Sequence, residues 1–403
     1  MLKRPLLVLI AALLVVFALV LSMRQPARRP ANAEGSQAAE PTSVRLFCAA
    51  SNRAVVEAIR REYEEECGRQ VEIEYGPSQT LLSAIAVSGQ GDLYLPADDS
   101  YLDLGHEQGL LAEQIPLASM RLVLCVPKGN PLGIDSFDDL LRDGLRVVQA
   151  QPDAAAVAKM TRRLLTEQDT WEALEGRTMA FRSTVTEVAS DVKLGAADVG
   201  IVFDAVLHTF PDLEAVALPE FSEGVAHIGV AVIKDSTQPA AALHFARYLA
   251  AKDRGAQQYK EHGFQPVDGD AWADVPEVSI YAGSMLRPAI EQTLVDFEQR
   301  EGVQVTRVYN GCGILVAQMQ GGRHPDAYFA CDVEFMNQVR EMFPEPVNVS
   351  GNELVILVQE GNPHGIRELK DLSRPGLRVG IGHEKQCAMG WLTQQTLTEG
   401  GVQ

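Results

Sequence analysis

The sequence lacks the short motifs that mark several common classes of enzyme. It contains no GxSxG, HExxH or GxxxxGK[ST] pattern, and no pair of CxxC motifs at the spacing of a zinc site. These absences argue against a hydrolase with a nucleophile elbow, a zinc protease, a P-loop nucleotide hydrolase and a zinc finger. We therefore predict a protein that is not an enzyme and that requires no cofactor.

Basic residues are scarce relative to acidic ones. Lys and Arg total 35 against 54 Asp and Glu, which gives a formal net charge of −19. This surplus of negative charge argues against a nucleic-acid partner and against binding along an anionic membrane surface. It does not exclude a small anionic ligand, because backbone amides and hydroxyls can hold an anion in a local pocket whatever the total charge.

One stretch near the N-terminus, residues 6–23, contains no charged residue. Lys3 and Arg4 precede this apolar run, and Arg24 ends it. Its length is just enough to span a bilayer. We predict that residues 1–24 form a single transmembrane helix that anchors the chain in the inner membrane. The alternative is a cleavable signal peptide, for which ANA at residues 31–33 is a small-residue cleavage site.

No cysteine precedes Cys48, so the chain offers no N-terminal cysteine for lipid attachment. Residues 25–43 are rich in Pro, Ala, Gln and Ser, which is typical of a flexible linker. We expect the rest of the chain to lie in the periplasm. It is tethered to the membrane in the first interpretation, and secreted into the periplasm if the N-terminal segment is cleaved.

The chain contains the same sequence pattern twice. Its 403 residues and 46% hydrophobic content are enough for two globular cores. Residues 44–85 align without a gap to residues 278–319 at a shift of 234, and GNPLGI aligns with GNPHGI at a shift of 232. We predict two copies of one domain, at 44–268 and 278–403. The second copy is incomplete, and we expect the sequence to be a fragment.

Each copy begins with the pattern of an α/β domain that has a parallel sheet. VRLF and VEIEY read as strands, and the apolar residues Val55, Val56, Ile59 and Tyr63 recur between them at helical spacing. Loops at the carboxyl ends of such strands gather at one edge of the sheet, where ligands bind. Two of these loops carry a serine at or next to a helix start. Serine is a favoured N-cap, but two equivalent loops favour a ligand site.

Copy 1 resembles the periplasmic molybdate-binding proteins of ABC transporters. The segments that carry the resemblance are AASNRAVVEAIRREYEEECG, YGPSQTL, DLYLPADDSYLD, KLGAADVGIVFDAVL and ALHFARYLAAKDRGAQQYKEHGFQP. The resemblance implies an α/β, two-lobed periplasmic binding protein fold (type II), repeated here and preceded by the transmembrane helix. It also implies the function of an extracytoplasmic solute-binding component, which binds a tetrahedral oxyanion such as molybdate or tungstate and delivers it to a permease.

The resemblance also implies which residues of copy 1 bind the oxyanion. Ser51 and Ser78 match the two serines whose hydroxyls hold the ligand in that family. Ala154 and Val185 match its two backbone amide donors from the second lobe. Phe203 stands where the family has a tyrosine, so one hydroxyl donor is missing.

In copy 2 the matching positions carry a different set of side chains. Cys312 aligns with Ser78 and lies between two glycines, Gly311 and Gly313, which fit a close backbone approach. Ser284 keeps a hydroxyl in the first loop. The remaining matches are Gln386 with Ala154, Cys387 with Ala155, and Cys331 with Ala97.

The copy 2 cysteines leave several interpretations open. Cys312 can be a weak substitute for serine while the other two are small buried residues. The thiols can bind a soft metal or an arsenic species, or two of them can form a disulfide in an oxidising compartment. An enzyme in which Cys312 is the nucleophile and His383 the base, and a non-transport scaffold or sensor domain, are further alternatives. For Cys48, Cys67 and Cys125 we expect buried structural roles.

Overall fold

The computed structural model describes residues 43–402. The predicted membrane anchor and nearly all of the predicted linker lie outside these residues. Within the described part, no helix is long and apolar enough to cross a membrane.

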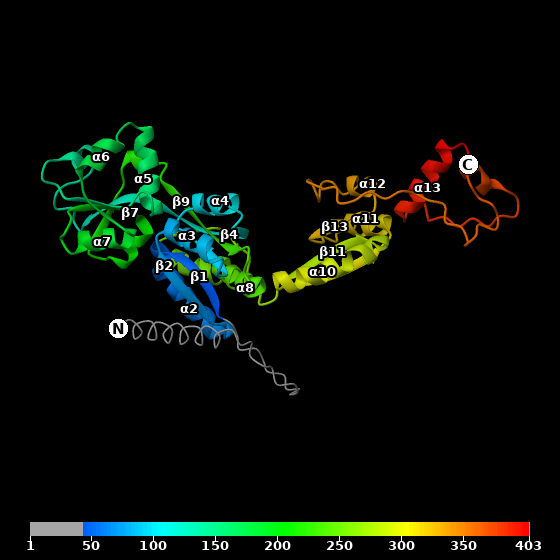
Figure 1. Cartoon of the computed structure of the whole chain (residues 1–403), viewed down its shortest axis with the longest axis horizontal. Coiled ribbons are helices and arrows are strands. Elements are labelled where there is room, and N and C mark those ends of the chain that lie inside the picture. Colours follow the sequence, from blue (N-terminus) through cyan, green and yellow to red (C-terminus); the bar gives the residue numbers. More distant parts are fainter. Residues whose placement is uncertain (1–42, 403) are drawn as a thin grey trace, which may run out of the picture. The chain divides into compact units, whose positions relative to one another are not determined.

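The first lobe of copy 1 is built on a parallel sheet with the order β2-β1-β3 (Figure 1). Its strands are β1 (Val44–Ala49), β2 (Val71–Gly76) and β3 (Leu93–Leu95). The helices that follow these strands and complete the lobe are α2 (Arg53–Cys67), α3 (Ser78–Ser88), α4 (Ser100–Glu107), α8 (Pro239–Ala250) and α9 (Gly255–Glu261). A short 3-10 turn, η1 (Ala50–Asn52), leads directly into α2.

Two long strands connect this lobe to a second one. Strand β4 (Leu111–Pro127) pairs with β9 (Val225–Ile233) along its first part, and with β7 (Val199–Phe203) and β8 (Leu213–Val216) along its second part. Strand β9 in turn lies antiparallel to β3. The two lobes therefore share one continuous ten-stranded sheet, in which β10 (Gln265–Pro266) pairs with β4.

The second lobe repeats the strand–helix alternation of the first. Strand β5 (Val147–Ala150) lies parallel to β6 (Thr178–Arg182) and to β7. Three helices connect these strands: α5 (Ala156–Glu167), α6 (Trp171–Arg177) and α7 (Val185–Lys193). The predicted two-lobed α/β fold is confirmed for this part of the chain.

Helix α2 shows how the sequence pattern produces the core. Val55, Val56, Ile59 and Tyr63 are all fully buried, as their helical spacing predicts. The helix ends at Gly68, whose φ of 67° is a left-handed conformation that glycine adopts without steric cost. The ring of Tyr63 packs against α8, where its hydroxyl lies 2.8 Å from Nδ1 of His244.

Two of the three cysteines of copy 1 have the buried environments expected from the sequence. Cys48 is buried in β1 and Cys125 in β4, while Cys67 is half-buried at the end of α2. Burial raises the pKa of Cys125 to about 12, so this thiol stays protonated at neutral pH. These properties are those of small buried residues.

Residues 277–402 contain a second, three-stranded parallel sheet with the order β12-β11-β13. Its elements are β11 (Glu277–Gly283), α10 (Arg287–Glu301), β12 (Gln304–Asn310), α11 (Cys312–Gln320), β13 (Ala327–Phe329) and α12 (Val333–Asn337). This is the order of β2, β1 and β3 at a constant shift. A 3-10 turn, η6 (Leu369–Ser373), and helix α13 (Ala388–Glu399) follow.

One apolar segment of copy 2 differs from its match in copy 1. Residues 353–358 align with the second part of β4 but form no strand, and Val355 and Leu357 are exposed. In copy 1 that part of β4 is paired with β7 and β8. The described part of copy 2 provides no equivalent of these two strands, and an apolar segment without a pairing partner forms no sheet.

Candidate functional site

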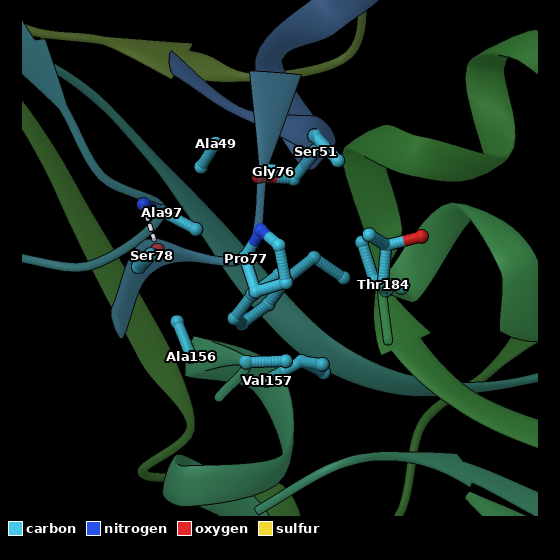
Figure 2. Close-up of a pocket in the computed structure, with 13 residues that line it drawn as sticks. Ala49, Ser51, Gly76, Pro77, Ser78, Ala97, Ala156, Val157 and Thr184 are labelled. Atoms are coloured by element: carbon cyan, nitrogen blue, oxygen red, sulfur yellow. Dashed lines mark hydrogen bonds between the residues drawn. The ribbon is translucent and has the colours of Figure 1, made fainter. Parts of the chain in front are cut away.

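A small pocket lies where the two lobes of copy 1 meet (Figure 2). Thirteen residues from both lobes line it: Ala49, Ala50, Ser51, Gly76, Pro77, Ser78, Ala97, Ala155, Ala156, Val157, Thr184, Val185 and Phe203. The first seven come from the carboxyl ends of β1, β2 and β3 and the turns after them. The other six come from the starts of α5 and α7 and from the last residue of β7.

Four helices begin at this pocket. They are α2 with its leading turn η1, α3, α5 and α7, each with its first residues in or beside the lining. A helix N-terminus carries a partial positive charge and unpaired backbone N–H groups. None of the thirteen described lining residues has a charged side chain. The pocket therefore presents a positive field without a carboxylate to oppose an anion, and without a lysine or arginine to neutralise one.

Ser78, the first residue of α3, is held in a fixed position. Its Oγ accepts a hydrogen bond from the backbone N–H of Ala97 at 3.1 Å, and its carbonyl accepts one from the Tyr94 hydroxyl at 2.8 Å. The side chain is 2% exposed. Because Oγ already accepts from a backbone amide, the hydroxyl proton remains available to donate to a ligand.

Ser51 has a different environment. Its hydroxyl is buried, and no hydrogen-bond partner for it exists among the described residues. Figure 2 shows Ser51 and Ser78 on the lining of the same pocket, with Pro77 between them. A buried hydroxyl without a partner costs folding free energy, so its presence at a pocket wall indicates a partner supplied from the pocket.

The two serines should therefore differ in their effect on stability. In Ser78→Ala the buried N–H of Ala97 loses its acceptor, and we expect the free energy of unfolding to fall by about 1–3 kcal/mol. In Ser51→Ala no hydrogen bond is lost, so we expect a neutral or slightly stabilising effect. Urea denaturation of the two variants without ligand measures this difference, and equal destabilisation would contradict the assigned bonding.

The start of α7 offers the backbone amides of the second lobe. Thr184 and Glu187 form a capping box, in which Glu187 N–H donates to Thr184 Oγ1 and the Glu187 carboxylate accepts from Ser183 and Thr184. The N–H of Val185 has no acceptor within the part of the chain that the structure describes. Val185, which the sequence predicted as an amide donor, thus lines the pocket with this group unpaired.

The start of α5 differs from the prediction. The N–H of Ala154 donates to the Gln151 carbonyl at 3.1 Å, and the Ala154 carbonyl accepts from Gln79 of the first lobe at 3.2 Å. Ala154 is not among the lining residues. Ala156 and Val157, the first two residues of the helix, do line the pocket, and within residues 43–402 their N–H groups have no acceptor. The backbone amides that can reach the pocket are therefore those of residues two and three positions after Ala154, the residue predicted from the sequence.

Phe203 lies where the sequence predicted it. It is the last residue of β7, is fully buried, and lines the pocket with an apolar ring. No hydroxyl is available from this position.

In copy 2 the glycines around Cys312 accommodate a neighbouring segment of the chain. A Cβ at Gly311 would lie 2.2 Å from the carbonyl oxygen of Gln386, and one at Gly313 would lie 2.0 Å from that of Lys385. The Gly313 N–H donates to Gln386 at 3.2 Å, as Gln79 donates to Ala154 in copy 1. The close backbone approach predicted from these glycines is thus made by residues 385–386, while Ser284 is exposed.

The copy 2 cysteines lie at the starts of helices or the end of a strand. Cys312 begins α11, Cys331 follows β13, and Cys387 is the N-cap of α13. All three are free thiols, and no hydrogen bond between His383 and Cys312 exists among the described residues. The pKa of Cys312 is lowered to about 7, chiefly by a hydrogen bond from the Cys331 side chain. Burial of the thiol opposes this shift, and a hydrogen bond from the Cys331 backbone N–H adds to it.

Comparison with known proteins places the chain in a family. The family model of bacterial extracellular solute-binding proteins matches residues 44–265 and 278–403. The molybdate-binding protein ModA of Mycobacterium tuberculosis H37Rv is 30% identical over 247 residues, covering 60% of this chain and 91% of that protein. ModA of Escherichia coli K12 is 25% identical over 239 residues, covering 57% and 91%.

A solved structure agrees with the fold of copy 1. The periplasmic binding protein AfuA from Actinobacillus pleuropneumoniae superimposes with a TM-score of 0.50 at 16% identity, covering 58% of this chain and 88% of that one. At this identity the likeness shows the fold alone. The relatives are solute-binding proteins rather than enzymes, as predicted. The chain therefore belongs to the family of bacterial extracellular solute-binding proteins, together with the periplasmic molybdate-binding proteins.

Proposed function

We propose that residues 44–268 bind a tetrahedral oxyanion of the molybdate or tungstate type in the pocket between the lobes, and deliver it to an ABC transporter permease. The observation that carries this proposal is the composition of the pocket. Four helix N-termini and two serine hydroxyls converge on it, and none of its described lining residues is charged. A buried dianion is tolerated only where several donors converge on it, and this pocket supplies neutral donors alone.

The same composition selects among oxyanions. Molybdate, tungstate and sulfate carry no proton at neutral pH, so each of their oxygens only accepts hydrogen bonds. Hydrogen phosphate has one O–H, which needs an acceptor when it is buried. Because the described lining has no carboxylate, that proton would be left without a strong acceptor. We therefore expect hydrogen phosphate to bind less tightly than the fully ionised dianions.

Phe203 modifies the expected affinity. A tyrosine at this position would add one hydroxyl donor, and a hydrogen bond to a charged ligand contributes about 1.5–3 kcal/mol. Its absence makes the site weaker than one that has all the donors implied by the resemblance to molybdate-binding proteins. The unpaired amides of Ala156 and Val157, from the same lobe as Phe203, supply donors to the pocket.

Calorimetric titration of the full chain with molybdate, tungstate, sulfate and phosphate tests the proposal. We expect saturable binding of the first two at one site per chain, with phosphate at least about tenfold weaker, which corresponds to about 1.4 kcal/mol. Thermal unfolding should shift upward with the ligands that bind, by mass action. Absence of any stabilising oxyanion would instead favour the scaffold or sensor alternative, and equal affinity for phosphate would refute the selection argument.

We propose further that residues 278–403 repeat the first part of the domain formed by residues 44–268. Two observations support this beyond the matching strand order. Asn130 and Ile134 exchange two hydrogen bonds in copy 1, and Asn362 and Ile366 exchange the same two in copy 2. Both asparagines have positive φ, 43° and 45°.

The location we propose is the outer side of the inner membrane, with residues 6–23 as anchor and both copies in the periplasm. The family supports an extracytoplasmic site of action. N-terminal sequencing of the protein from cells distinguishes the two forms, because a mature N-terminus at Glu34 would show that the segment is cleaved.

A further inference from the structure

The three cysteines of copy 2 occupy positions that line the pocket in copy 1. Cys312 matches Ser78, Cys331 matches Ala97, and Cys387 matches Ala155. All three of these copy 1 residues line the oxyanion pocket between the lobes. Of the six cysteines in the chain, the three that belong to copy 2 therefore fall on this one site. Cysteines that serve only as small buried residues would not be expected to gather at one site.

Two of these cysteines, Cys312 and Cys331, are in contact. The backbone N–H of Cys331 donates to the Cys312 sulfur at 3.3 Å, which repeats the bond from Ala97 to Ser78 in copy 1. A Cβ built at Gly283 would lie 2.0 Å from the Cys331 sulfur and 3.0 Å from the Cys312 sulfur. The Cys312 and Cys331 sulfurs are therefore at most 5.0 Å apart.

Gly283 is a further change that belongs with this pair. It aligns with Ala49, which lines the pocket of copy 1 and carries a methyl group. At Gly283 a methyl group would occupy the space of the Cys331 sulfur. The second thiol therefore fits only because glycine stands beside it, and copy 2 differs from copy 1 at all three positions, 283, 312 and 331, in a way that makes room for two sulfurs.

The pair suits a soft centre better than a hard anion. A thiol is a weak donor, and a thiolate repels a dianion, so the exchange of Ser78 for Cys312 removes a good oxyanion ligand. Cys312 is 1% exposed, which protects its sulfur from solvent. No group of three or more His, Cys, Asp or Glu residues in the described part is arranged to hold a metal ion, so the candidate ligands are the two sulfurs of this pair.

We propose that Cys312 and Cys331 bind one soft, thiophilic centre, such as Cu(I) or trivalent arsenic, between their two sulfurs. Thiolate ligands select soft centres over hard ones. With metal–sulfur bonds of about 2.3 Å, one ion bridges sulfurs up to about 4.6 Å apart. The upper bound on the separation of this pair exceeds that span by a few tenths of an ångström, which a small side-chain rotation closes. Cu(I) binding releases two protons, one from each thiol. Arsenous acid, As(OH)3, forms two As–S bonds, breaks two As–O bonds and releases two water molecules, without a change of oxidation state.

The test uses the full chain, reduced and handled without oxygen. Competition for Cu(I) against a chromophoric chelator, and native mass spectrometry with arsenite, should each show one equivalent bound. The double variant Cys312→Ser with Cys331→Ala restores the copy 1 residues at both positions, and we expect it to lose at least 100-fold in affinity for both probes. Cys67→Ser removes a thiol of copy 1, and binding should be unchanged in this control.

A second measurement keeps the proposal testable if the double variant folds poorly. In the unmodified chain, saturation with arsenite should protect Cys312 and Cys331 from iodoacetamide after denaturation, while Cys67 is alkylated. Two results would overturn the proposal: a Cys312–Cys331 disulfide in protein isolated from cells under alkylating conditions, or probe binding that survives in the folded double variant. Neither result affects the oxyanion site, which belongs to copy 1.

Discussion

Ser51→Asp should abolish oxyanion binding by copy 1. The substitution places a carboxylate where the buried hydroxyl now faces the pocket without a partner among the described residues. At about 4 Å and an effective dielectric constant of about 20, two like unit charges repel by about 4 kcal/mol, and a dianion doubles this. We therefore expect a loss of at least about 1,000-fold in molybdate affinity, measured by calorimetry.

Ser51→Asn is the matched control, because asparagine has nearly the shape of aspartate but no charge. We expect it to retain binding within about tenfold of the parent, which corresponds to about 1.4 kcal/mol. If both variants lose binding equally, the pocket rejects the larger side chain and the electrostatic argument fails. If neither loses binding, the anion does not occupy this pocket.

Tyr63→Ala should strongly destabilise the first lobe. Tyr63 is fully buried, its ring lies 4.7 Å from that of Phe245 between centroids, and its hydroxyl contacts His244. Truncation of a buried aromatic residue to alanine leaves a cavity between α2 and α8 and costs about 3–5 kcal/mol. Chemical denaturation followed by circular dichroism measures this loss.

Helix α10 supplies a matched control for this prediction. Phe297 occupies the same position in α10, but it is 42% exposed, and α10 has no buried residue among those described. Phe297→Ala should therefore change the free energy of unfolding by less than about 1 kcal/mol. Tyr63→Phe, which keeps the ring, should cost about 0.5–1.5 kcal/mol for the lost hydrogen bond. A small effect of Tyr63→Ala would mean that α8 does not pack on α2 in this way.

The elements of copy 1 could be predicted because their signals are local. The apolar spacing in α2 identified its buried face, and the alternation of strands and helices identified the parallel sheet. The alternation of strand, helix and strand is repeated in β11, α10 and β12 of copy 2. The segment at 353–358 was different, since an apolar run becomes a strand only when another strand pairs with it. Pairing of this kind depends on residues far away in the chain.

The candidate site was predictable to a similar degree. Ser51, Ser78, Val185 and Phe203 line one pocket. The positions of the two serines in strand-end loops suggested this, whereas Val185 and Phe203 were implied by the resemblance to molybdate-binding proteins. The first turn of α5 was not predictable from sequence. Its N-cap is Ala155, within a run of alanines, and no Ser, Thr, Asn or Asp stands at that position to mark the helix start. Three successive alanines look equivalent in sequence although only some of their amides are free.

The sequence by itself determined the match between residues 44–85 and 278–319 and the buried face of α2. It also identified the loops that carry Ser51, Ser78 and Cys312, and the replacement of the Ser78 hydroxyl by the Cys312 thiol in copy 2. Only the tertiary structure decided which of these groups are available to a ligand. Ser78 Oγ already accepts from Ala97, Ser51 Oγ has no partner among the described residues, and Cys331 fits because Gly283 lies beside it. The physical reason is that hydrogen-bond satisfaction and steric room depend on neighbours from distant parts of the chain, which a local pattern does not contain.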